Sequence, residues 1–304
     1  VVAARGGVIV ICSPEILFLA DRDGDGRAEI QQKLYETSGG PMWDRPSCPR
    51  WGIDNWIYYD GGFRFQSDGS RQEPATGTGQ FGQTNSDWGD RFYIVQVQPI
   101  RYVVPLPHHY LSRNPYHGAR ADTQSLLTYQ DVYPISKPDP WRAKRGQDPA
   151  WLKFYGAAEA TPNGYMTSAC GPLIYRATLF PPEYWGNYFF CENAQNFIHR
   201  CLLERDGAGY RARRASDEKQ EFLASSEEWF RPVTLALGPD GAIYIVDMYR
   251  EIIEDYSAIP RYLQQQYVES LIAGHDRGRI LRLTVDGAPK WRPFDLRQAA
   301  VAEL

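Results

Sequence analysis

Apolar residues are spread along this chain in short runs, and several of these runs share one arrangement. A polar turn comes first and an aromatic or β-branched run follows it: WGIDNWIYYDGG (51–62), DWGDRFYIV (87–95), LGPDGAIYIVD (237–247) and, less closely, PEYWGNYFFCE (182–192). Asp-Asn and Asp-Gly pairs form tight turns, and the run after each pair is typical of a strand. A strand unit that repeats without long helices between its copies indicates a β-propeller, whose blades bury their faces against their neighbours. The pattern therefore predicts an all-β propeller in which each copy is a turn followed by an inner strand.

Two regions depart from this rhythm. From about 105 to 163, prolines, histidines and polar residues replace the strand pattern, which predicts one long insertion across a face of the propeller. PRYLQQQYVESLIAG (260–274) has apolar residues at helical spacing, and FDLRQAAVAEL (294–304) begins another helix. We expect a propeller domain over 1–288, the start of a helical region over 289–304, and two ends cut from a longer protein.

One hairpin carries a candidate metal site. DRDGDGRAE places Asp21, Asp23 and Asp25 at alternate positions, with a glycine next and Glu29 at the ninth position. Alternating carboxylates followed by glycine suit a hard cation such as calcium. An EF-hand requires Glu at position twelve, and that position is Gln32, so we expect a shorter calcium loop between two strands, with a structural role. The alternative is an acidic, solvated turn that binds nothing, because turns use Asp and Gly anyway.

Charge excludes some partners. Lys and Arg number 33 against 37 Asp and Glu, and the formal net charge of −4 gives no electrostatic reason to expect nucleic acid or an anionic membrane as a partner. No apolar run reaches the eighteen residues that a membrane-spanning helix needs.

The five cysteines show no CxxC pair and no zinc-ligand spacing with histidine. A disulfide from Cys191 to Cys201, or from Cys170 to Cys191, is one interpretation of their positions. Buried free thiols are the other.

Several longer motifs carry a resemblance to a known family. In chain order they are WGIDNWIY, YLSRNPY, TSACGPLIYR, EFLASSEEWFRPV, GPDGAIYIVDMYREIIE and DRGRILRL. The chain resembles the propeller module of the planctomycete and verrucomicrobial membrane-bound dehydrogenase proteins of the haem-binding type. Those are large secreted proteins that often carry HEAT-like repeats and a cytochrome c domain after the propeller. The resemblance implies a periplasmic or secreted location and a cytochrome c partner within the longer chain.

That module is similar in turn to soluble quinoprotein sugar dehydrogenases, six-bladed propellers that bind pyrroloquinoline quinone (PQQ) with calcium. This second resemblance implies an incomplete six-bladed propeller and a sugar or other small polar substrate. It places Arg231 where the sugar enzymes pair an arginine with the quinone carboxylates, a task that suits a planar guanidinium. Tyr249 and Arg250 are expected beside it as cofactor-binding residues, and Asp247 as a catalytic residue.

Two positions depart from the sugar-dehydrogenase pattern. Asp44 stands where those enzymes have their general-base histidine, so Asp44 is the candidate base here, although an ordinary aspartate is a weak proton acceptor. The lysine that contacts the quinone falls near Ala194 or Gln195.

Three function classes follow. The first is a quinoprotein sugar or alcohol dehydrogenase that passes electrons to a cytochrome. The second, almost level with it, is a non-catalytic propeller that binds glycans or proteins. The third is a calcium-dependent hydrolase of the lactonase type, which would need acidic ligands at the channel centre, whereas the acidic loop found here is peripheral.

Overall fold

The computed structural model describes residues 1–37, 45–77, 79–116, 123–127, 131–155, 166–254 and 259–288. These residues form five antiparallel sheets with a few short helices between them. No helix within these ranges is both long enough and apolar enough to cross a membrane.

The first three sheets each contain four strands that are adjacent in the chain as well as in space. Sheet one contains β1 (Val2–Ala4), β2 (Gly7–Cys12), β3 (Glu15–Ala20) and β4 (Ile30–Glu36). Sheet two contains β5 (Ser47–Trp51), β6 (Ile57–Asp60), β7 (Phe63–Phe65) and β8 (Gln72–Pro74). Sheet three contains β9 (Gln83–Asn85), β10 (Arg91–Val95), β11 (Gln98–Val103) and β12 (Thr123–Leu127).

The last two sheets follow the same order. Sheet four contains β13 (Ala169–Ile174), β14 (Tyr188–Glu192), β15 (Phe197–Asp206) and β16 (Gly209–Arg214), and β17 (Leu223–Ala224) pairs with β15. Sheet five contains β18 (Pro232–Leu237), β19 (Ile243–Asp247) and β20 (Arg279–Leu283).

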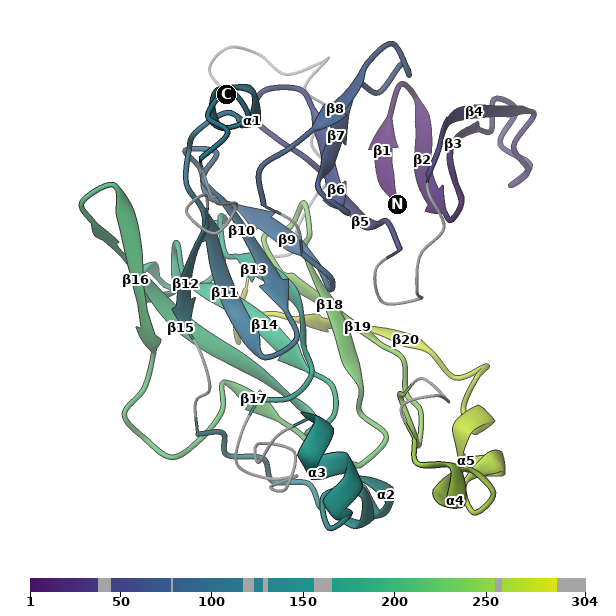
Figure 1. Ribbon diagram of the computed structural model, residues 1–304, viewed down its shortest axis with the longest axis vertical. Helices are drawn as coiled ribbons and strands as arrows, with labels where there is room; N and C mark the ends of the chain where they lie inside the picture. The colour runs from purple at the N-terminus through teal and green to yellow at the C-terminus, as the bar shows by residue number, and fades with distance from the viewer. Residues whose placement is uncertain are drawn as a thin grey trace.

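The five sheets are the blades of a propeller. The first strand of each sheet contacts the first strand of the next, in the order β1, β5, β9, β13 and β18. The sheets consequently follow one another in an arc, from purple through teal to yellow (Figure 1). The all-β propeller fold is therefore confirmed, but the described residues form five blades and not the six of the propeller type that the resemblance implies. The blade count depends on how many strand units the chain contains, and a resemblance to a longer protein does not supply that number.

The repeated turns occupy equivalent places, as their sequences predict. Each connects the first strand of its blade to the second, between β5 and β6, β9 and β10, β13 and β14, and β18 and β19. In all four, the residue two positions before the second strand has a left-handed backbone, with φ of 63° at Asn55, 83° at Gly89, 72° at Gly186 and 77° at Gly241. One detail of the prediction is wrong: the strand after the turn is the second of its blade, and the strand before the turn contacts the neighbouring blade's first strand.

Blades two and five repeat their polar contacts as well as their strands. Asp54 accepts hydrogen bonds from the Tyr58 hydroxyl at 2.7 Å and from Arg64 Nη1 at 3.0 Å. Asp240 likewise accepts hydrogen bonds from the Tyr244 hydroxyl at 3.2 Å and from Arg282 Nε at 2.7 Å. In both blades the aspartate lies in the turn, the tyrosine on the second strand and the arginine on the third.

Hydrophobic cores lie between neighbouring blades. Ile9 and Phe18 of blade one pack with Ile57 of blade two in one such core. Two further cores join blades three and four and blades four and five. Their fully buried aromatic members include Phe92, Tyr188 and Phe190 in the first and Phe189 in the second. Burial of apolar area between blades is the main force that holds such repeats together.

The region predicted as one insertion contains an element of blade three. Its first part carries α1 (His108–Leu111), β12 then forms the outer strand of the blade, and α2 (Pro140–Arg145) and α3 (Pro149–Tyr155) follow. A 3₁₀ turn, η4 (Pro182–Tyr184), lies in the β13–β14 connection.

The helix predicted over 260–274 is two short helices, α4 (Arg261–Gln264) and α5 (Val268–Ile272). Trp141 of α2 packs with Ile252, Ile259 and Leu263 in a small core, so α2 lies against the connection that follows β19 (Figure 1). Residues 289–304, predicted to begin a helical region, lie outside the described residues.

Candidate functional site

The acidic loop brings its four carboxylates together. One side-chain oxygen from each of Asp21, Asp23, Asp25 and Glu29 lies within 4.8 Å of the others, and all four residues are exposed. Backbone amides shape the loop, since Asp21 accepts hydrogen bonds from the Gly24 amide at 2.6 Å and the Gly26 amide at 2.9 Å. These two hydrogen bonds, that of Gly24 foremost, lower the pKa of Asp21. Converging carboxylates repel one another, and a bound cation would offset that repulsion. The arrangement therefore suits a cation that prefers oxygen ligands, such as calcium.

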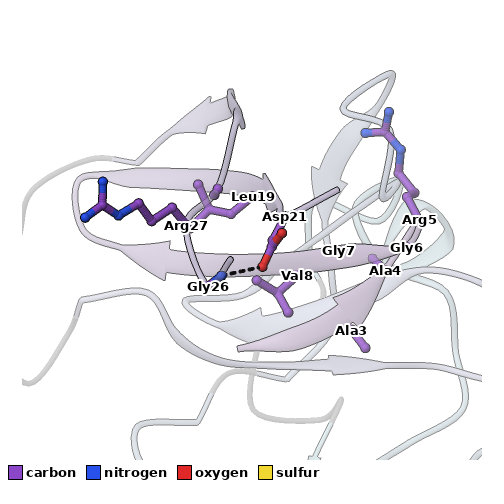
Figure 2. Close-up of a pocket in the computed structure, with 11 residues that line it drawn as sticks. Ala3, Ala4, Arg5, Gly6, Gly7, Val8, Leu19, Asp21, Gly26 and Arg27 are labelled. Carbon is purple, nitrogen blue, oxygen red and sulfur yellow. Dashed lines mark hydrogen bonds between the residues drawn. The ribbon is translucent and has the colours of Figure 1, made fainter. Parts of the chain in front are cut away.

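A shallow cavity of about 670 Å³ lies beside this loop on blade one. Figure 2 shows Asp21 turned toward Gly26 on the cavity wall, with Arg5 and Arg27 at opposite ends. Gly6, Gly7 and Ala28 also line it. The cavity is open to solvent, and its only charged lining residues are Arg5, Asp21 and Arg27. It therefore contains no group of residues arranged for catalysis.

Arg231 lies immediately before β18, on the segment that leads into the GPDG turn, and it is fully buried. Its guanidinium forms a two-pronged ion pair with Asp139, in which Nη2 lies 2.6 Å from Oδ1 and Nη1 lies 3.3 Å from Oδ2. Asp139 is the residue before α2, so a side chain from the insertion reaches across to blade five.

Backbone carbonyls take the remaining donors of Arg231. Nε donates to Arg250 O at 3.1 Å, and Nη1 also faces Asn193 O at 3.2 Å and Ala194 O at 3.3 Å. Nη2 additionally donates to Glu251 O. A guanidinium has five N–H donors, and all five of them therefore already have acceptors within this chain.

Asp247, a predicted catalytic residue, is the last residue of β19 and is fully buried. Its Oδ1 accepts the Arg231 amide at 2.8 Å and the Tyr249 amide at 2.9 Å, while Oδ2 accepts Arg279 Nε at 2.8 Å. Arg231, Asp247 and Arg250 lie close together, but they meet largely through backbone groups. Both carboxylate oxygens of Asp247 already accept hydrogen bonds, and its role in catalysis stays a prediction.

Tyr249 and Arg250 follow directly after β19. Tyr249 adopts a left-handed backbone conformation with φ of 49°, which is uncommon for a residue with a bulky side chain. Its hydroxyl donates to Glu227, and the Arg279 guanidinium lies 4.0 Å from the centre of its ring. The hydrogen bond to Glu227 raises the pKa of Tyr249. The Arg250 guanidinium makes no hydrogen bond or ion pair with other described residues.

The fifth predicted participant, Asp44, lies outside the described residues. Its role as a general base therefore stays a prediction. The positions that replace the quinone-contacting lysine, Ala194 and Gln195, are buried, and Ala194 contributes the carbonyl oxygen that faces Arg231.

Two buried carboxyl groups escaped the sequence analysis. Asp60 and Glu192 end β6 and β14, the places that correspond to Asp247 on β19. Asp60 accepts the Gly82 amide at 2.9 Å, and Glu192 accepts the Ser168 amide at 2.9 Å. Burial raises the pKa of both carboxyl groups to about 7. The sequence did contain a signal for them. The runs YYD, FCE and IVD each end in an acidic residue, and because the blades repeat, these residues occupy equivalent places.

All five cysteines are free thiols. Cys170 lies directly opposite Cys191 across β13 and β14, whereas Cys191 pairs with Ile198 on β15, so Cys191 and Cys201 are not in register for a bond. Of the two interpretations of the sequence, the structure has the free thiols.

The residues around Arg231 do not fit PQQ. A cofactor carboxylate at Arg231 would need the donors that Asp139 and the carbonyls already hold, and it would meet the negative charge of Asp139. The acidic loop, by contrast, fits calcium in ligand type and spacing.

Several solved structures share the general architecture. A glucose dehydrogenase is 14% identical over 77% of this chain and 71% of its own, with a TM-score of 0.43. The apo form of the soluble aldose sugar dehydrogenase from Escherichia coli is 9% identical over 77% of this chain and 70% of its own, with a TM-score of 0.44. A luciferin-regenerating enzyme is 12% identical over 94% of this chain and 76% of its own, with a TM-score of 0.49. Similarity this distant transfers neither a residue role nor an activity.

The sequence itself has no match among curated proteins. It does match one family over nearly its whole length, from residue 1 to residue 287. The chain therefore belongs to the family described as domain of unknown function DUF7133.

Proposed function

We propose that this chain is a non-catalytic binding propeller, built on a scaffold resembling that of the sugar dehydrogenases. The observation that carries the proposal is the buried ion pair between Arg231 and Asp139. The arginine that the resemblance pairs with the quinone carboxylates, Arg231, already holds a carboxylate from its own chain.

The energetic argument concerns what a cofactor would have to displace. Removing one partner of a buried ion pair typically costs about 3 to 5 kcal/mol, because the other charge stays buried without compensation. A PQQ carboxylate that displaced Asp139 from Arg231 would leave the Asp139 carboxylate buried without a counter-charge, and the contacts of PQQ would have to offset that cost. The Asp139 side chain is only 9% exposed, so water offers it little compensation.

The neighbouring groups support the same conclusion. A general base needs a free lone pair within hydrogen-bond reach of the substrate proton. Asp247 is fully buried and already accepts hydrogen bonds from two amides and from Arg279 Nε, so a substrate would have to enter the protein interior to reach it. Near Arg231, a backbone carbonyl of Ala194 stands in the region that the resemblance assigns to a lysine.

In this proposal calcium stabilises blade one. The acidic loop lies between β3 and β4, at the edge of the arc, and Asp23 and Asp25 also accept backbone amides within the loop. A cation there would neutralise four carboxylates and fix the hairpin. The propeller would belong to the longer exported protein that the resemblance implies, beside its cytochrome c domain.

The test is a titration of the chain with PQQ in the presence of calcium, followed by calorimetry and by the absorbance of the quinone. We expect no binding, whereas a soluble quinoprotein sugar dehydrogenase under the same conditions binds and serves as the positive control. Stoichiometric PQQ binding that is lost in Arg231→Lys would overturn the proposal. Such binding would favour the second candidate function, a quinoprotein dehydrogenase. The proximity of Arg231, Asp247 and Arg250 is the observation that supports this candidate.

A further inference from the structure

Three large apolar side chains project from the turns of consecutive blades. Trp88 is 80% exposed, Ile53 is 64% exposed and Trp185 is 48% exposed. Each lies in the connection between the first and second strand of its blade, in blades three, two and four respectively. Large exposed side chains that gather on one face mark a binding site more often than isolated ones do.

These turns form one surface, which we call the tryptophan rim (Ile53, Trp88 and Trp185). Ile53 packs over Gly89, where an added Cβ would meet the Ile53 side chain. Asp87, next to Trp88, pairs with Arg176 of blade four, with Oδ1 lying 2.6 Å from Nε. The amide of Gly186 bonds to the carbonyl of Tyr175 at 2.9 Å, which brings Trp185 beside Arg176.

Hydrogen bonds close the turns that carry the two tryptophans. In the first, the Ser86 hydroxyl oxygen accepts the amides of Trp88 at 3.2 Å and Asp90 at 3.1 Å, and the Ser86 amide donates to Asp90 O at 2.9 Å. In the second, Trp185 Nε1 donates to Phe180 O at 2.8 Å, which fixes the indole ring. A ring held in place in the free protein loses little entropy when a ligand binds.

Polar groups with unused hydrogen-bonding capacity lie in the same two turns as the tryptophans. Oδ2 of Asp87 and the two terminal nitrogens of Arg176 have no hydrogen-bond partner among the described residues, and neither does the Trp88 indole N–H. The two charged side chains are 69% and 37% exposed, respectively. The rim therefore offers flat apolar rings beside one carboxylate acceptor and one guanidinium donor.

We propose that the tryptophan rim binds a neutral carbohydrate chain. A pyranose ring has C–H faces that stack on indole and hydroxyl groups at its edge that bond to carboxylate and guanidinium together. A protein partner would instead require about 800 Å² on each side with a continuous apolar centre, and the Asp87–Arg176 pair interrupts that centre here. The inference rests on the proposed function, because it names the site and the ligand class of a binding propeller.

Affinity gel electrophoresis of the whole chain tests this inference, with hydroxyethylcellulose, laminarin or heparin in the gel. We expect at least one of the two neutral glucans to retard the chain. Trp88→Ala should weaken that binding about tenfold, which corresponds to about 1.4 kcal/mol. Trp88→Phe, which keeps a ring, should recover part of it. The matched control is Tyr262→Ala, an exposed aromatic on α4 at the far end of β19, which should migrate like the parent chain.

The inference is wrong if neither glucan retards the chain, or if Trp88→Ala is retarded as strongly as the parent. Retardation by heparin alone that disappears in Arg176→Ala would also overturn it, because charge and not ring stacking would then be responsible. These outcomes are separate from the PQQ titration. PQQ binding would remove the binding-module proposal and leave glucan retardation to be measured independently.

Discussion

Arg231 and Asp139 are 92 positions apart in the chain, and their side chains form a two-pronged ion pair that is almost inaccessible to solvent. This contact joins the insertion, at the residue before α2, to the segment that leads into the first strand of blade five. It fills the place where a cofactor carboxylate was expected, and it makes the insertion part of the blade structure.

Replacing Asp139 with alanine should destabilise the chain strongly. The Arg231 guanidinium would keep its carbonyl contacts and lose its counter-charge, so we expect a loss of about 3 to 5 kcal/mol in the free energy of unfolding. Urea denaturation measures it. Asp206→Ala is the control, because its pair with Arg211 at 2.7 Å is exposed and should contribute less than about 1 kcal/mol. Equal losses in the two variants would show that the buried pair has no special role.

Calcium should raise the melting temperature of the chain. A cation that binds only the folded loop stabilises it by mass action, and the gain grows with free calcium. The measurement compares melting in calcium with melting in chelator, and Asp23→Ala should abolish the difference. Asp68→Ala, an exposed aspartate in another turn, should leave it unchanged. If calcium has no effect on the parent chain, the loop is an ordinary acidic turn.

Asp60 should make stability fall as pH rises. Its pKa is about 7 in the folded chain against 3.8 as the ordinary value, so the folded state holds the proton more tightly. The resulting stabilisation is complete below about pH 4 and is lost as pH rises through about 7. A displacement of about three pKa units corresponds to at most about 4 kcal/mol.

Asp60→Asn removes this titration, so the stability of the variant relative to the parent should improve between pH 5 and pH 8. Urea denaturation at the two pH values gives the comparison, and exposed Asp206→Asn should show no such trend. A parent and an Asp60→Asn variant with parallel pH profiles would mean that Asp60 stays ionised when folded.

Glycines at the repeated turns should be equally intolerant of a side chain. A Cβ at Gly52 would lie closer than 3.0 Å to Asp54 and Tyr58, and one at Gly238 would approach Asp240 and Tyr244 in the same way. We expect each alanine substitution to cost about 1 to 3 kcal/mol through overpacking. The losses should add in the double variant, because the two blades are separate.

Thermal or urea unfolding measures both variants. Gly278→Ala is the control, since the nearest atom to its Cβ would be Asp247 O at 3.8 Å. If Gly52→Ala is silent while Gly238→Ala is severe, the two turns are not physically equivalent.

The sequence by itself determined the features that depend on neighbours in the chain. Two of the repeated turns are local structures, at Gly52 to Trp56 and at Gly238 to Ala242. In each, an aspartate side chain accepts a hydrogen bond from the backbone amide two residues later. The acidic loop is also local, because alternating positions and two glycines suffice to bring its carboxylates together. Periodicity therefore predicted the strands, the turns, the all-β propeller and the candidate cation site.

Only the tertiary structure decided the partners of the buried charges. The resemblance placed Arg231 on the segment before the GPDG turn, but nothing near it in the sequence indicated that Asp139 of the insertion would contact it. It also gave no way to see that Trp88 and Trp185 lie on one rim, since the contacts that join their turns cross from blade to blade. The physical reason is that a buried ion pair or a shared surface depends on how separate elements pack, and no periodicity within one element records that packing.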